Sequence, residues 1–212
     1  MDFVQQIQSG DIATLRRLSP KELRDITVQD LSGKEIVRLC QDAPIFNQKV
    51  CSDPNIWTQL FKRDVTEDPT IINQMTPQEF RQEYLRLFLN EIENDEMADT
   101  EGYEIKNDFY EISELGYEKF LNTYVLVDGS DRTLFLESDY VEDALKKAIQ
   151  AGHYRMVISL FNYLLTFIMD DLEYIWPQPF EDLVTLAQSA GHEDILEFLQ
   201  NEKDRLETKL QE

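Results

Sequence analysis

The sequence predicts a mainly α-helical protein with one small β-hairpin in its middle. Apolar residues recur at three- and four-residue steps along most of the 212 residues, as on the buried face of a helix. Two segments that lie 39 residues apart share a helix–turn–helix pattern, and a period of this length is typical of stacked repeats. Strand-like runs are expected only at 123–136, on either side of Asp128-Gly129-Ser130-Asp131, where glycine permits a tight turn.

Charge narrows the classes of partner. The chain has 42 acidic and 20 basic side chains, which gives a formal net charge of −22. Such a surface repels phosphate backbones and anionic lipids, so we expect neither nucleic acid nor a membrane as a partner. The sequence shows no signal peptide and no apolar run long enough to span a membrane. Cys40 and Cys51 are too few for a disulfide framework and favour a reducing compartment.

Helix-start signals mark the first part of the chain. Ser19 and Glu22 have capping-box spacing on either side of a proline, and Thr76 and Glu79 have the same spacing. We therefore expect helices to begin at 20 and at 77. An acidic segment, 90–114, follows the second of these helices. Its first half lacks the apolar residues that offset the entropy of ordering, so we expect a solvated loop there.

The repeat places both histidines of the chain in equivalent positions. His153 follows Gly152, and His192 follows Gly191. We expect each glycine to end a first helix in the left-handed conformation, and each histidine to bond backbone groups in the turn. Stacked helices would separate the histidines by roughly 10 Å, too far to share a zinc ion that binds nitrogen at about 2.0–2.1 Å. A metal-binding or acid–base pair is the alternative, although no Cys cluster or further His lies nearby in the sequence.

Further helix signals coincide in the two units. Asp143 and Asp182 are expected to cap the first helices. Ala148 and Ala187 keep those helices thin enough for a close neighbour. Because neither unit can bury its apolar face alone, we expect the two to stack.

The repeat unit resembles the ankyrin repeat, whose first helix opens with Thr-Pro-Leu-His and whose turn reads Gly-His. Here the opening positions read Asp143-Ala144-Leu145-Lys146, in which the leucine matches, and the period exceeds the family's length of about 33 residues. The segment 3–18 looks like a third, decayed copy with Asp11 in place of the histidine. The resemblance implies a helical surface that holds a protein client.

A second resemblance covers "SPKELRDITVQDLSGKEIVRLCQDAPIFNQKVCSDPNIWTQLFKRD", residues 19–64, which is similar to an F-box-type domain of three helices. The arrangement is most like the F-box-like modules beside ankyrin repeats in proteins of large DNA viruses, although Ser19 replaces the usual leucine before the proline. The resemblance implies docking to a Skp-type adaptor of cullin ubiquitin ligases. The alternative is that these apolar side chains form a small helical core. The residues expected to support docking are Pro20, Leu23, Ile36, Trp57 and Leu60.

These patterns predict five segments. They are a decayed ankyrin-like helix pair at 1–18, an F-box-like module at 19–70, a connector of helix, acidic loop and hairpin at 71–140, two ankyrin-like repeats at 141–203, and a tail at 204–212.

No enzyme signature accompanies the helices. The sequence has no Gly-rich phosphate loop, no His-Glu-x-x-His motif and no nucleophile elbow, and a calcium loop in the acidic segment would need Met97 as its first ligand. We therefore expect a non-enzymatic protein–protein interaction module without cofactors, located in the cytoplasm, which is the host cytosol if the protein is viral. The alternative is a structural component of a scaffold or virus particle, located in the virion and bound to capsid proteins.

Overall fold

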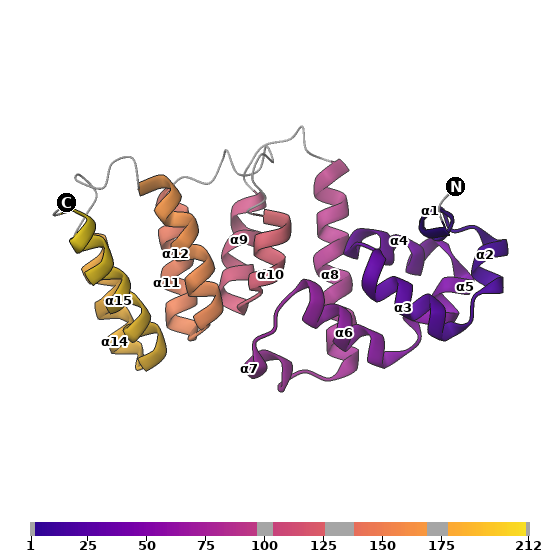
Figure 1. The fold of residues 1–212 in the computed structure, drawn as a ribbon, viewed down its shortest axis with the longest axis horizontal. Coiled ribbons are helices and arrows are strands. Elements are labelled where there is room, and N and C mark those ends of the chain that lie inside the picture. The colour runs from indigo at the N-terminus through magenta and orange to yellow at the C-terminus, as the bar shows by residue number, and fades with distance from the viewer. Residues whose placement is uncertain (1–2, 97–103, 126–137, 169–177, 211–212) are drawn as a thin grey trace. The chain divides into compact units, whose positions relative to one another are not determined.

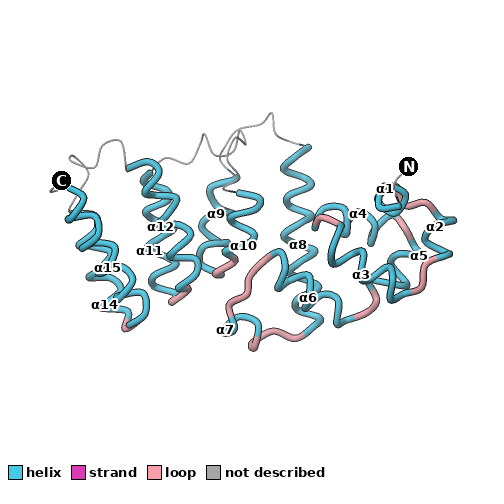
Figure 2. The backbone as a smooth tube through the Cα atoms, viewed as in Figure 1, coloured by secondary structure: helices cyan, strands magenta, loops and turns pink. Residues whose placement is uncertain are grey.

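The computed structural model describes residues 3–96, 104–125, 138–168 and 178–210, and every regular element in these ranges is a helix (Figures 1 and 2). The predicted mainly α-helical class is confirmed. The chain divides into two compact units, Met1–Thr100 and Glu101–Glu212. The first unit contains α1 (Phe3–Gln8), α2 (Ile12–Arg17), α3 (Pro20–Asp30), α4 (Gly33–Asp42), α5 (Pro44–Phe46), a π-helical turn (Asn47–Cys51), α6 (Pro54–Asp64), α7 (Pro69–Ile72) and α8 (Pro77–Glu96). The second contains α9 (Glu104–Leu115), α10 (Glu118–Phe120), a π-helical turn (Leu121–Val125), α11 (Ser138–Ala151), α12 (Tyr154–Ile168), α14 (Gln178–Ala190) and α15 (Glu193–Leu210).

Capping boxes start the helices of the first unit where the sequence predicts them. The Ser19 backbone N–H donates to the Glu22 carboxylate at 2.8 Å, while the Glu22 N–H donates to the Ser19 hydroxyl at 3.2 Å. Thr76 and Glu79 exchange the same bonds at the start of α8. In the first pair, the Ser19 hydroxyl also holds the pKa of the Glu22 carboxyl below its usual value. Each box satisfies N–H groups that a helix start leaves unpaired.

Aromatic side chains fill the core between α6 and α8. Trp57 meets Tyr84 edge-to-face with ring centroids 5.7 Å apart, and Phe61 lies 5.0 Å from Phe80. The ring of Phe88 covers Gly33 at the start of α4, where an added Cβ would approach it to 2.1 Å. All four named aromatic residues of the α6–α8 contact are at most 2% exposed, so α8 is part of the core of the first unit.

A polar network joins α3, α6 and α8. Arg63 donates to the carbonyl oxygens of Thr27 at 3.1 Å and Val28 at 2.7 Å, near the end of α3, where helical carbonyls lack partners within the helix. Its guanidinium also pairs with Asp64 at 2.5 Å. The Tyr84 hydroxyl donates to the same carboxylate, again at 2.5 Å. These bonds fix the position of α3 relative to the aromatic core.

The structure joins Cys40 and Cys51 by a disulfide, contrary to the expectation of two thiols. Cys40 lies in α4 and Cys51 ends the π-helical turn, with Cα atoms 6.0 Å apart. The Trp57 indole N–H donates to the Cys51 carbonyl at 2.9 Å, which places the bond beside the core. The two residues are 11 positions apart in sequence, and the turn between α4 and α6 brings them together.

Several predicted segments differ from the observed ones. The helix expected to end at 92 continues as α8 to Glu96, into the expected loop, and Thr123–Val125, the expected start of the hairpin, lies in a π-helical turn. The rest of the predicted hairpin, 126–136, lies outside the described residues. The expected connector 71–140 is divided between the two units. The expected tail is largely helix, since α15 reaches Leu210 and buries Leu206.

The helices of the second unit that the structure describes form three pairs. They are α9 with α10, α11 with α12, and α14 with α15, and Figure 1 shows the three pairs side by side in chain order. The first helices pack in sequence, because α11 contacts both α9 and α14. The second helices follow, because α12 contacts both α10 and α15. The two predicted repeats therefore stack as expected, and a third pair precedes them.

Candidate functional site

Glycine turns define the geometry of the stacked pairs. Gly116, Gly152 and Gly191 have φ values of 73°, 78° and 78°, so the left-handed conformation expected at Gly152 and Gly191 is confirmed. In each turn the glycine N–H donates to the carbonyl three residues earlier, and the next N–H donates to the carbonyl five residues earlier. This bond pair is the Schellman motif, which ends a helix and satisfies its last carbonyls. Gly10, with φ 69°, makes the same two bonds between α1 and α2.

Each histidine covers the glycine of the preceding turn. A Cβ built on Gly116 would lie 2.6–2.9 Å from three atoms of the His153 ring. A Cβ on Gly152 would lie 2.5–3.0 Å from three atoms of the His192 ring. His192 also lies with Nε2 3.3 Å from the Gln150 carbonyl, and donates to it when that nitrogen is protonated. We expected each histidine to bond backbone groups within its own turn, whereas this bond links neighbouring turns.

The histidines do not form part of a metal site in the ranges that the structure describes. No group of three or more His, Cys, Asp or Glu side chains there is arranged to hold a metal ion. Both imidazoles instead pack on backbone of the preceding turn, at Gly116 and Gly152. The observed contacts are those of a structural role in repeat stacking.

The predicted helix caps of the repeats are not at the positions expected. Asp143 and Asp182 lie inside their helices, because α11 begins at Ser138 and α14 at Gln178. Within α11, Asp143 instead forms an ion pair with Lys146 at 3.6 Å. Glu142 forms a second ion pair with the same lysine at 2.7 Å. The hydrogen bond to Glu142 is the main cause that raises the pKa of Lys146.

The expected docking residues of the first unit lie mostly inside it. Leu23, Ile36 and Leu60 are 0% exposed and Trp57 is 1% exposed, whereas Pro20 is exposed at the start of α3. Direct contact with a partner is therefore open to Pro20 alone among the five in this conformation. The other four hold α3, α4 and α6 together and so support any surface that these helices present.

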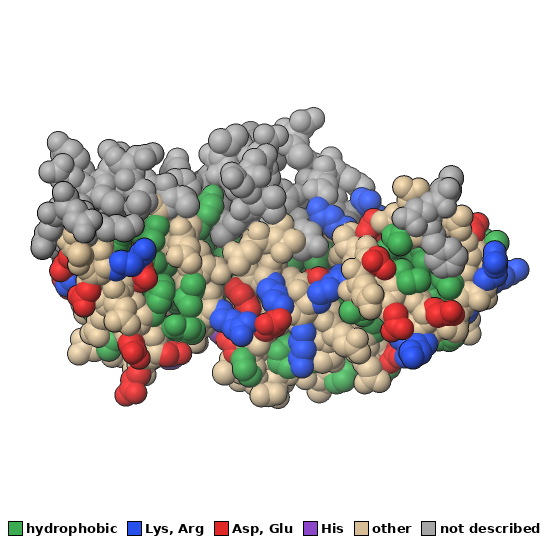
Figure 3. Space-filling model, viewed as in Figure 1, with side chains coloured by type: hydrophobic (Ala, Val, Ile, Leu, Met, Phe, Trp, Pro, Cys, Tyr) green, Lys and Arg blue, Asp and Glu red, His purple; other side chains and the backbone are tan. Residues whose placement is uncertain are grey.

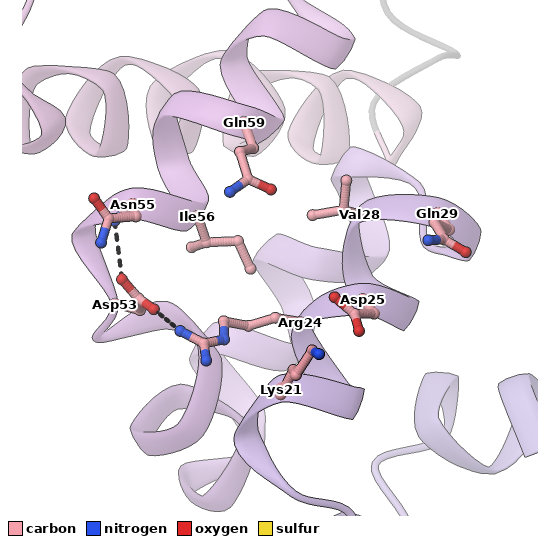
Figure 4. A pocket seen from close by; sticks show the side chains of 9 residues that line it. All are labelled: Lys21, Arg24, Asp25, Val28, Gln29, Asp53, Asn55, Ile56 and Gln59. Carbon is pink, nitrogen blue, oxygen red and sulfur yellow. Dashed lines mark hydrogen bonds and ion pairs between the residues drawn. The ribbon is translucent and has the colours of Figure 1, made fainter.

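A groove with a volume of about 410 Å³ lies between α3 and α6 (Figure 4). Val28 of α3 and Ile56 of α6 point toward one another across it, and the Gln59 side chain extends above them. Arg24 crosses its lower edge and pairs with Asp53, the residue that caps α6. The remaining lining residues are Lys21, Asp25, Gln29 and Asn55.

The ion pair at the groove is partly exposed. The side chains of Arg24 and Asp53 are 39% and 18% accessible to solvent. The pKa of the Asp53 carboxyl lies below its usual value, mainly because the Asn55 backbone N–H donates a hydrogen bond to it at 3.0 Å. The hydrogen bond from Arg24 lowers this pKa further. The carboxylate thus stays ionised and keeps the guanidinium in place. Across the first unit, on the face that Figure 3 shows, acidic and basic side chains are interspersed.

Comparisons with protein-family models, curated proteins and solved structures give no match for this chain. Within the described ranges, no helix combines the length and the apolar character needed to cross a membrane.

Proposed function

We propose that this chain is a non-enzymatic protein–protein interaction module, in which the first unit docks an adaptor and the second unit holds a client. The observation that carries the proposal is the repeated turn of the second unit: three helix pairs share one turn geometry, and their rings and glycines interlock from pair to pair. Arrays of this type present an extended surface along their length, and binding proteins use that surface.

For the first unit, the proposed partner is the Skp-type adaptor of cullin ubiquitin ligases that the resemblance of residues 19–64 implies. The support is indirect. Leu23, Ile36 and Trp57 pack as a shared core beneath α3, α4 and α6, so these helices can offer a fixed docking face with Pro20 at its edge.

Co-precipitation of the intact chain from a eukaryotic cell extract tests this proposal. Pro20→Ala is compared with Pro77→Ala, because both prolines occupy the first position of a helix that begins with a capping box. We expect the wild type and Pro77→Ala to recover the adaptor in equal amounts and Pro20→Ala to recover several times less. Recovery of no adaptor, or a fixed-ratio complex with capsid proteins alone, would reject the adaptor assignment.

A further inference from the structure

We propose that Ser19 is a phosphorylation site for a protein kinase that recognises arginines two and three residues before its target serine. Residues 16–19 read Arg-Arg-Leu-Ser, so Arg17 and Arg16 occupy these two positions. The segment 16–21 has three basic residues and no acidic one, and no other six-residue segment of this acidic chain shares that composition. This inference goes beyond the proposed interaction function and can be tested without it.

The two arginines are available to a kinase. Both lie in the last turn of α2, both are exposed, and among the described residues neither side chain has a hydrogen bond or an ion pair. A guanidinium pairs with a carboxylate through two parallel N–H···O bonds, so a substrate cleft lined with acidic side chains recognises arginines at fixed distances from the target hydroxyl. The same arginines disfavour a kinase whose cleft is built for acidic substrates.

Ser19 is exposed and lies in an extended link between two helices. Leu18 has φ −76° and ψ 137°, and Ser19 has φ −66° and ψ 157°. A cleft that binds a linear segment reads an extended backbone, and these two residues already have one. The six-residue helix α2 has little stability of its own, so its last turn can open locally and lengthen that segment. Pro20 lacks an N–H, so the kinase must be one that needs no backbone donor after the serine.

The transfer uses MgATP as the second substrate of the kinase. The Ser19 Oγ attacks the γ-phosphorus, the Oγ–P bond forms, and the bond from this phosphorus to the β,γ-bridging oxygen breaks, so that ADP leaves. The hydroxyl proton passes to the catalytic aspartate of the kinase. In the folded chain the Ser19 hydroxyl bonds the Glu22 carboxylate at 2.6 Å, and this bond must open before the transfer.

The phosphate would change the start of α3. It carries a charge of about −1.5 to −2 at neutral pH, so it would repel the Glu22 carboxylate from the Ser19 backbone N–H, to which that carboxylate is bonded at 2.8 Å. A phosphate oxygen would accept the Glu22 N–H in place of the hydroxyl, and the two arginines would balance part of the charge. The modification therefore alters the charge beside Pro20, the exposed member of the expected docking residues.

Phosphorylation of the intact chain in a eukaryotic cell extract, supplemented with MgATP and phosphatase inhibitors, tests the inference. Mass spectrometry locates and quantifies the phosphate in the wild type, Ser19→Ala, the double variant Arg16→Ala/Arg17→Ala and the control Ser32→Ala. Ser32 is a matched control because it is exposed and starts α4 with the same capping box, but no arginine lies within the three residues before it. Circular dichroism verifies the fold of each variant, and a standard arginine-containing substrate peptide verifies that kinases of this class are active in the extract.

We expect equal phosphate on Ser19, within about twofold, in the wild type and in Ser32→Ala. The double arginine variant should carry at least about threefold less, because each lost pair with a carboxylate weakens recognition by the kinase. Both arginine side chains are exposed, so their removal leaves the core intact. The inference is overturned if Ser19 of the wild type carries no phosphate, or if the double variant loses less than this, which would assign the serine to a kinase that reads the following proline alone. Either result would leave the adaptor proposal standing, because adaptor docking does not depend on the modification.

Discussion

Substitution of the turn glycines by alanine separates two reasons for their presence. Gly152 and Gly191 have the same φ of 78°, but they differ in what an added Cβ would meet. At Gly191 nothing lies within 4 Å, whereas at Gly152 the Cβ would lie 2.5–3.0 Å from the His192 ring. Gly191→Ala therefore measures the cost of the left-handed conformation alone, and Gly152→Ala adds the overlap with the ring.

The magnitudes follow from these two contributions. The left-handed conformation costs an alanine about 1–2 kcal/mol, which is the expected loss of unfolding free energy for Gly191→Ala. In Gly152→Ala the His192 ring must also move, and overpacking of this kind costs about 1–3 kcal/mol. Its Nε2 bond to the Gln150 carbonyl, 3.3 Å long, would weaken as part of the same movement. We expect Gly152→Ala to lose about 2–5 kcal/mol in total.

Urea unfolding of the full chain, followed by far-ultraviolet circular dichroism, measures these losses. The double variant Gly152→Ala/His192→Ala is the control, because removal of the ring removes the overlap. We expect it to be more stable than the sum of the two single changes by about 1 kcal/mol or more. If Gly152→Ala and Gly191→Ala lose the same free energy within error, the ring is not packed on the glycine and the interpretation is wrong.

Three further predictions concern the first unit. Lys49→Met removes the ammonium group that donates to three carbonyl oxygens at the end of α2. It should lower the unfolding free energy measured in urea by about 1–2 kcal/mol, and Lys49→Arg should lower it by less, because arginine keeps the charge and the N–H donors. The pKa of Glu22 is lower in the folded state, so its stabilising effect is complete above the unfolded value of about 4.3 and is lost as the pH falls through the folded value. Glu22→Gln should therefore flatten the acid side of a stability–pH profile, and an unchanged profile would contradict the Ser19 bond. Cys40→Ser should lower the unfolding free energy by about 3 kcal/mol under non-reducing conditions, and a reductant should lower the urea midpoint of the wild type but not of the variant.

The features that could be predicted from the sequence are helix ends at which one side chain caps the backbone or one glycine adopts the left-handed conformation. The capping boxes at Ser19 and Thr76 and the left-handed glycines at 152 and 191 all appear as predicted. Each depends on a few neighbouring residues, so tertiary packing does not change the outcome. The stacking of α11 and α14 was also predictable, because the 39-residue period shows that the two units share one pattern.

The first helix pair of the second unit escaped the sequence analysis for a chemical reason. Its turn reads Gly116-Tyr117 in place of Gly-His, and its first helix lies in the second half of the acidic segment 90–114, for which we predicted no helix. The usable signal was "ELGYEKF" against "QAGHYRM", at an offset of 36 residues. Phe109 and Ile112 are buried, so a few apolar side chains are enough to order this helix against its neighbour.

The remaining misses depend on contacts that are distant in sequence. The β-branched and aromatic residues at Thr123–Val125 favour strand locally, but this segment continues the helix that packs beside α12, as the bond from Asn122 to Ser159 at 3.1 Å illustrates. The disulfide likewise depends on how the segment between α4 and α6 folds back. The docking candidates depend on the helix faces, since a spacing pattern alone does not tell a core residue such as Trp57 from a contact residue.

The residue that directly follows the turn glycine in each helix pair argues for a structural role of the histidines and against a chemical one. Tyr117 occupies this position in the first pair and is 4% exposed, although a phenol, unlike an imidazole, does not ordinarily exchange its proton near neutral pH. What they share is a flat ring that directly follows the glycine of a Schellman turn. The Gly10 turn makes the same two bonds with Asp11 at this position, so the ring serves the contact between stacked pairs of the second unit and not the turn itself. A protein built in this way can vary its surface without loss of its fold, and surface variation is what recognition of a protein partner needs.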